Sequence, residues 1–117
     1  RITLSKKTLN LKLYYNLEKI RTSHIIEEIE KLYDFPIIVL FGSFSSATDS
    51  IESDVDMCII SNIEKEFPIE RYEKILNRKI SLHIFTKNSF AKAKRLNKEL
   101  INNICNGIVL SGELEVL

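Results

Sequence analysis

The chain has 117 residues, of which 44% are hydrophobic and 28% are charged, and its formal net charge is +1. This size and balance are typical of one globular domain with an adequate core. A net charge near zero argues against a surface that binds nucleic acid mainly through the phosphates. No apolar run is long enough to cross a bilayer, so we expect no membrane contact and a cytoplasmic location. Cys58 and Cys105 lie in apolar segments and are expected to be buried thiols.

The first part of the chain is expected to be a short arm followed by a helix. Leu11, Tyr14 and Leu17 recur at helical spacing. We therefore divide the chain into an N-terminal arm and helix, residues 1–21, and a domain, residues 22–117. Because the sequence starts with Arg1, one interpretation left open is that residues 1–21 are the tail of a further N-terminal module.

A second helix and a buried strand follow. Ser23 is a suitable N-cap for a helix whose apolar stripe includes Ile25 and Ile29, and Pro36 is expected to end it. Residues 37–41 form a continuous, mostly β-branched apolar run, which predicts a strand covered on both faces. Gly42 and Ser43 end this run. Glycine allows the backbone to approach a ligand closely, and a short helix starting after Ser43 would attract an anion such as a triphosphate.

The most informative residues are two aspartates at the start of the next apolar run. In a strand, Asp54 and Asp56 point to the same side, while Val55 points into the core. Two adjacent carboxylates repel each other, and a divalent cation removes that penalty. Oxygen ligands of this kind suit Mg²⁺, which binds through one or two carboxylates together with substrate phosphates.

The second half of the chain continues the alternation of helices and strands. Pro68 fits the first turn of a helix, and residues 80–85 predict a strand with Ser81, His83 and Phe85 on one face. A basic helix over residues 90–96 and a last helix ending before Gly107 precede a short strand near residues 108–110. We therefore expect one α/β (α+β) domain with a small mixed sheet of about three to five strands flanked by helices.

Gly42-Ser43, nine intervening residues and then Ser53-Asp54-Val55-Asp56 resemble the signature of the DNA polymerase β-like nucleotidyltransferase superfamily. The pattern is most similar to the minimal nucleotidyltransferase branch and to its archaeal-type members. The resemblance implies a polymerase β-like palm that moves a nucleoside monophosphate from an NTP, with ATP as the expected donor, to an acceptor hydroxyl. It implies that Asp54 and Asp56 are catalytic and bind Mg²⁺, or Mn²⁺ in its place. Gly42 and Ser43 would hold the phosphates, and Ser53 would support the first aspartate.

The chain departs from that family pattern at two places. The family carries a third carboxylate on the strand formed here by residues 80–85, where the apolar pattern places His83. His83 would then complete the metal shell or take the proton of the acceptor. The sequence leaves two alternatives open: His83 only packs beside the strand, or Glu52 or Glu64 replaces the missing carboxylate. The arginine and glycine that usually follow the Gly-Ser are replaced by Ser46 and Ala47. These departures support a second hypothesis, a catalytically degenerate module that binds a nucleotide or a partner.

The acceptor and the partners are expectations from the resemblance alone. Minimal nucleotidyltransferases commonly pair with a small helical HEPN-type protein and act as antitoxins that add AMP to it. A small alcohol or the end of an RNA are alternative acceptors. Nucleic acid would otherwise bind only through a missing N-terminal module, and a homodimer is a further arrangement that the sequence leaves open.

Overall fold

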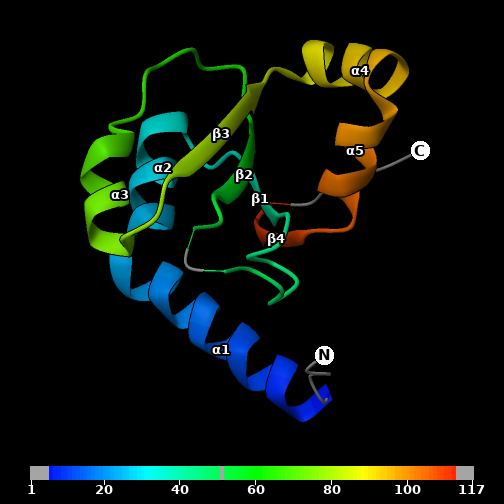
Figure 1. The fold of residues 1–117 in the computed structure, drawn as a ribbon. Helices are drawn as coiled ribbons and strands as arrows, with labels where there is room; N and C mark the ends of the chain where they lie inside the picture. The colour runs from blue at the N-terminus through cyan, green and yellow to red at the C-terminus, as the bar shows by residue number, and fades with distance from the viewer. Residues whose placement is uncertain (1–5, 51, 113–117) are drawn as a thin grey trace.

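The computed structural model describes residues 6–50 and 52–112 of the chain. Its helices are α1 (Lys6–Ser23), α2 (Ile25–Tyr33), α3 (Ile69–Leu76), α4 (Lys87–Leu96) and α5 (Lys98–Cys105). Its strands are β1 (Ile37–Phe41), β2 (Val55–Ile60), β3 (Ile80–Phe85) and β4 (Ile108–Ser111). Figure 1 shows these elements arranged as a twisted sheet with helices around it.

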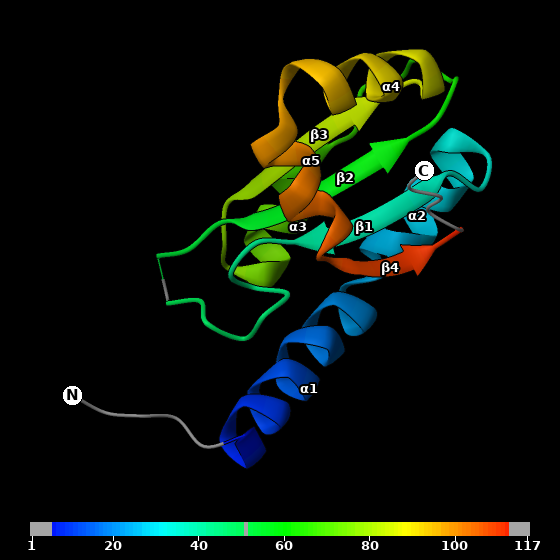
Figure 2. The same cartoon turned by 90° about the vertical axis from the view of Figure 1, so that its right-hand side faces the viewer.

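The sheet has four strands in the order β3-β2-β1-β4. β1 pairs antiparallel with both β2 and β4, while β2 and β3 run parallel. Parallel neighbours need a crossover connection, and the segment that contains α3 supplies it between β2 and β3. Figure 2 shows the four strands side by side. This mixed sheet with flanking helices confirms the predicted α+β fold class.

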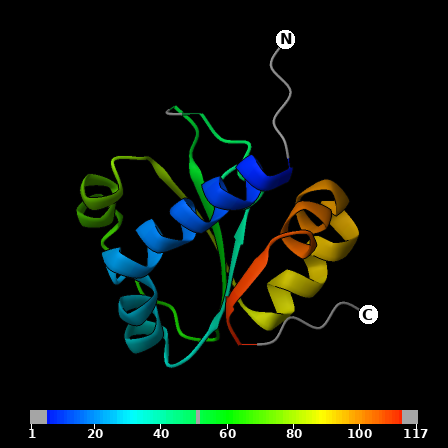
Figure 3. The same ribbon diagram turned by 90° about the horizontal axis from the view of Figure 1, so that it is seen from below.

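Helices cover both faces of the sheet, which explains why β1 is apolar along its whole length. On one face, residues of α1, α2 and α3 pack against Ile38, Leu40 and Met57. On the other face, α4 and α5 pack against Val39, Phe41 and Cys58. Figure 3 looks along the sheet and shows these two groups of helices on opposite sides of the strands. Buried apolar area on both faces is the main source of stability for a sheet of this kind.

Helix α1 is the longest helix among the described residues, and its second half packs on the domain. Asn16 and Ile20 are buried, whereas Leu11, Tyr14 and Tyr15 are exposed. The interpretation that residues 1–21 are the tail of a further module stays a prediction. None of the helices within residues 6–50 and 52–112 combines the length and apolar character needed to span a membrane.

The two cysteines are free thiols on the α4–α5 side of the sheet. Cys58 is fully buried, and burial raises the pKa of its thiol to about 12. Cys105 is only half-buried. The prediction of buried thiols is therefore confirmed for Cys58 and holds only in part for Cys105.

Candidate active site

The site is built around a close contact between the end of β1 and the start of β2. Gly42 directly follows β1, and the antiparallel register pairs its neighbour Phe41 with Asp56. A Cβ atom placed on Gly42 would lie 2.3 Å from Oδ2 of Asp56, so any other residue at this position would force the carboxylate to move. Gly42 also has a φ of +77°, a conformation that L-residues rarely adopt. The Gly-Ser turn and the second aspartate therefore meet, although fourteen positions separate Gly42 from Asp56.

The segment after Ser43 forms a single hydrogen-bonded turn. The carbonyl oxygen of Gly42 accepts from the amides of Ser45 and Ser46, and the amide of Thr48 donates to the carbonyl of Ser43. The hydroxyls of Ser45 and Ser46 also donate to the Gly42 carbonyl, and this local bonding competes with a helix. Ala47 then has a φ of 59° and ends the turn. The short helix on which anion binding after Ser43 would depend therefore does not form.

Ser53 and Asp54 lie between this loop and β2. The side chain of Ser53 accepts a hydrogen bond from the amide of Ser50 at 2.9 Å, and the amide of Ser53 donates to the carbonyl of Ser50 at 3.1 Å. Ser53 thus closes the end of the loop, and within the described part of the chain no hydrogen bond joins it to Asp54. Asp54 is exposed and Asp56 half-buried, two positions apart at the start of β2.

The surroundings of Asp56 disfavour its charged form. Burial raises the pKa of the Asp56 carboxyl above its usual range, and the neighbouring charge of Asp54 raises it further, while His83 acts in the opposite direction. A carboxylate that is destabilised by a second carboxylate gains from a nearby cation. The electrostatics of the pair therefore favour cation binding.

Strand β3 brings Ser81 and His83 to this region. The parallel register places Ser81 beside Asp56 and His83 beside Cys58, one step further along the same face. The hydroxyl of Ser81 lies 3.3 Å from Nε2 of His83, and the His83 ring is 5.5 Å from the ring of Phe41. Ser81, which we did not single out from the sequence, is thus the direct neighbour of Asp56. Only the register of β3 could have identified it.

The donor set fits a metal ion that is held partly by a substrate. Among the described residues, no group of three or more His, Cys, Asp or Glu side chains is placed to hold a metal ion. Asp54, just before β2, and Asp56, within it, are close enough for their charges to interact, and such a pair matches Mg²⁺ bound jointly by protein and phosphate oxygens. The pair does not resemble a site in which protein side chains supply every ligand.

A buried carboxylate in the middle of the loop also escaped the sequence analysis. The side chain of Asp49 is 0% exposed and contacts Lys12 and Asn16 of α1 and Arg78, which lies before β3. Burial raises the pKa of Asp49, but hydrogen bonds from Asn16 and Arg78 and the charge of Lys12 outweigh it, so the pKa is lowered overall. The surroundings of Asp49 therefore favour its ionised form, and its partners come from two separate parts of the chain, α1 and the segment before β3.

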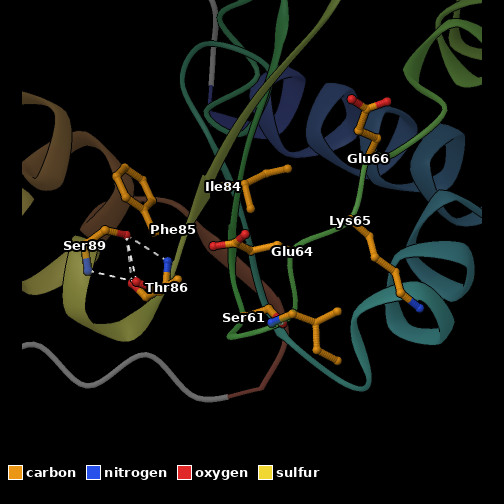
Figure 4. Close-up of a pocket in the computed structure, with 9 residues that line it drawn as sticks. Ser61, Glu64, Lys65, Glu66, Ile84, Phe85, Thr86 and Ser89 are labelled. Atoms are coloured by element: carbon orange, nitrogen blue, oxygen red, sulfur yellow. Dashed lines mark hydrogen bonds between the residues drawn. The ribbon is translucent and has the colours of Figure 1, made fainter.

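A pocket of about 630 Å³ lies at the other end of β2 and β3. Figure 4 shows that Ile84 and Phe85 line it from the end of β3, and that Glu64 and Lys65 line it from the segment after β2. Thr86 and Ser89 form a capping box at the start of α4, so the first amides of this helix have partners within the protein. Asp54 and Asp56 lie at the opposite end of the parallel strands, and the pocket is separate from their site.

Comparison with known proteins identifies the family of this chain. A search of curated proteins gave no match to the chain. The family model described as "Polymerase beta, Nucleotidyltransferase" matches residues 23–114, which include all four strands and every residue of the Gly42–Asp56 site. The chain therefore belongs to the polymerase beta nucleotidyltransferase family.

Proposed function

We propose that this protein is a metal-dependent nucleotidyltransferase that moves a nucleoside monophosphate from an NTP, with ATP as the donor, to an acceptor hydroxyl. The observation that carries this proposal is the contact between Gly42 and the carboxylate of Asp56 in a member of the nucleotidyltransferase family. This contact joins a turn suited to phosphates to a pair of carboxylates suited to Mg²⁺.

Each residue of the site has a proposed role. Asp54 and Asp56 hold Mg²⁺, or Mn²⁺ in its place, and the bound ion would supply stabilisation of the charge that develops on the transferred phosphoryl group. Ser43 binds phosphate oxygens beside Gly42. Ser53 acts through the loop, because its hydrogen bonds to Ser50 fix the chain just before Asp54.

His83 has a proposed role in proton transfer. It lies on the same face of the sheet as Asp56 and contacts the hydroxyl of Ser81. A histidine in this position can accept the proton of an acceptor hydroxyl, as a general base does. An alternative role for His83, completing a metal shell that would favour Mn²⁺ over Mg²⁺, would require its side chain to move, because no three such ligands among the described residues are placed to hold a metal ion.

The proposed acceptor is a hydroxyl group of a HEPN-type helical protein, which would make this protein antitoxin-like. The support is the similarity of the Gly42–Asp56 segment to minimal nucleotidyltransferases. A small alcohol and the end of an RNA remain the alternative acceptors, and the test below includes them.

The test is transfer of label from α-labelled NTPs. The purified protein is incubated with each NTP, Mg²⁺ or Mn²⁺, and one acceptor at a time: a HEPN-type protein, an RNA with a free 3′ hydroxyl, or a small alcohol. We expect metal-dependent label on one acceptor, and no label with Asp54→Asn or Asp56→Asn. Glu52→Gln is the matched control, because it removes an exposed carboxylate of the same loop. Equal transfer by the wild type and both aspartate variants would refute the proposed site.

One observation favours a second candidate function, a catalytically degenerate binding module. In the part of the chain that the structure describes, Asp54 and Asp56 are not joined by a third acidic side chain in a potential metal site. Such a module would bind a nucleotide or a partner without turnover. Metal-dependent nucleotide binding without transfer to any acceptor, with Mg²⁺ or Mn²⁺, would favour this second function.

A further inference from the structure

We infer that Asp49 is a positioning residue that holds the loop between β1 and β2, and with it Gly42, Ser43 and Asp54, in the geometry needed to bind the nucleotide. This inference rests on the proposed function. It implies that residues of α1 and of the segment before β3 help to position the nucleotide site. Helix α1 lies almost entirely outside the region matched by the family model.

The loop is attached to α1 at two places. Nδ2 of Asn16 donates to Oδ1 of Asp49 at 2.9 Å and to the carbonyl of Phe44 at 3.1 Å. Nζ of Lys12 lies 3.4 Å from Oδ1 of Asp49 and also donates to the backbone carbonyl of Asp49. Asn16 and Phe44 are both buried, so water has little access to these bonds. Helix α1 therefore holds both the first and the middle part of the loop.

The loop is attached to the start of β3 by a third contact. Nη1 of Arg78 lies 3.0 Å from Oδ2 of Asp49 and 3.5 Å from the carbonyl of Ser53, the residue before Asp54. The guanidinium of Arg78 also lies over the ring of Phe44, 5.6 Å from its centroid. Arg78 thus links the middle of the loop to its end, beside the first aspartate.

Asp49 is the one carboxylate in this cluster and faces two cations, Lys12 and Arg78, so removing its charge would move the loop. Asp49 is fully buried and the side chain of Arg78 is only 13% exposed. Removing one member of such a pair leaves an uncompensated charge, which must reach water for solvation. Because the two ends of the loop carry Gly42-Ser43 and Asp54, a shift of the loop changes the distance between the phosphate-binding turn and the carboxylates. A misplacement of about 1 Å costs about 10²-fold in a catalytic site.

The test compares Asp49→Asn with a matched variant elsewhere. Asp49→Asn keeps the shape of the side chain and removes its charge. Ile29→Val is the control, because Ile29 is buried in α2, its apolar side chain makes no hydrogen bond or ion pair to the loop, and its shortening lowers stability by about 1 kcal/mol. Two quantities are measured: the affinity for a non-hydrolysable ATP analogue with Mg²⁺, and the hydrogen-exchange rates of the Ser45, Ser46 and Thr48 amides.

We expect Asp49→Asn to weaken binding of the analogue by about tenfold to 10²-fold, the size of the loss of one charged contact to the ligand, and to speed exchange of the three amides, with both quantities unchanged in Ile29→Val. Arg78→Lys, which keeps the positive charge, is expected to retain more affinity than Arg78→Ala. If Asp49→Asn fails to fold, Lys12→Met gives the same comparison, because Lys12 is partly exposed and its loss leaves the bonds from Asn16 and Arg78 to Asp49 in place.

These measurements distinguish failure of the Asp49 inference from failure of the proposed function. Wild-type affinity and wild-type exchange in Asp49→Asn would overturn the inference while leaving the proposed function intact. A wild-type protein that binds no nucleotide would overturn the proposed function, and the exchange rates would still decide whether Asp49 holds the loop.

Discussion

Replacing Gly42 with alanine tests the contact that joins the two halves of the site. The new Cβ would lie 2.3 Å from Oδ2 of Asp56, whereas an ordinary van der Waals contact begins at 3.4 Å, so the carboxylate must retreat by roughly 1 Å. Losing one charged contact to the bound metal and nucleotide costs about 1.5–3 kcal/mol, so metal-dependent nucleotide binding is expected to weaken by about tenfold to 10²-fold. In addition, the φ of +77° at Gly42 costs an L-residue about 1–2 kcal/mol of folding stability.

The control for this experiment is Gly112→Ala. Gly112 has nearly the same φ, +76°, but the nearest atom to its Cβ would be Cγ1 of Ile37 at 3.0 Å, away from the site. Urea denaturation measures stability, and titration with a non-hydrolysable ATP analogue and Mg²⁺ measures binding. We expect both variants to lose a similar free energy of unfolding, and only Gly42→Ala to lose binding. Wild-type affinity in Gly42→Ala would refute the argument that Asp56 needs the space beside Gly42.

Three further predictions concern stability and reactivity. The pKa of the Asp56 carboxyl is raised in the folded protein, so the fold is more stable when this carboxyl is protonated than when it is charged. This stabilisation is complete below the pKa of the carboxyl in the unfolded chain, about 4, and is lost as the pH rises through its pKa in the folded protein. Asp56→Asn should therefore melt at a higher temperature than the wild type at neutral pH and show no advantage in acid; a lower melting temperature at neutral pH would contradict this. Thr86→Ala removes the cap of α4 and should cost about 1 kcal/mol of unfolding free energy without changing nucleotide binding, a combination that denaturation and calorimetry can check. Cys58 should stay unmodified by a thiol reagent in the native protein while Cys105 reacts, and mass spectrometry of digested protein would expose the opposite order.

The sequence predicted those parts of the fold that depend on local patterns. The apolar run of β1 and the alternation in β3 depend on which residues must face a core, so they are visible without a structure. The spacing of Gly42-Ser43 from Asp54 and Asp56 identified the segment that the family model also covers. The roles proposed for the individual residues of this segment stay predictions.

Features that depend on contacts between distant segments could not be predicted. The neighbour of Asp56 on β3 is Ser81, because the register of two parallel strands is set by the packing of the crossover between them. Likewise, nothing in the local sequence links Asp49 to Asn16 or to Arg78, which lies 29 positions further along the chain. Whether a helix starts after Ser43 was open in the sequence, and none forms there because serine hydroxyls bond to nearby carbonyls and compete with helix formation.

The most direct test of the proposed site is calorimetric titration of the protein with a non-hydrolysable analogue of each NTP, in the presence of Mg²⁺ or Mn²⁺. The double variant Asp54→Asn/Asp56→Asn serves as the comparison, and Glu52→Gln controls for the loss of loop charge. We predict metal-dependent binding, strongest for the ATP analogue, that is retained in Glu52→Gln and lost in the double variant. Binding that survives in the double variant, or no binding by the wild type with either metal, would contradict the assignment of Asp54 and Asp56 to a metal–nucleotide site.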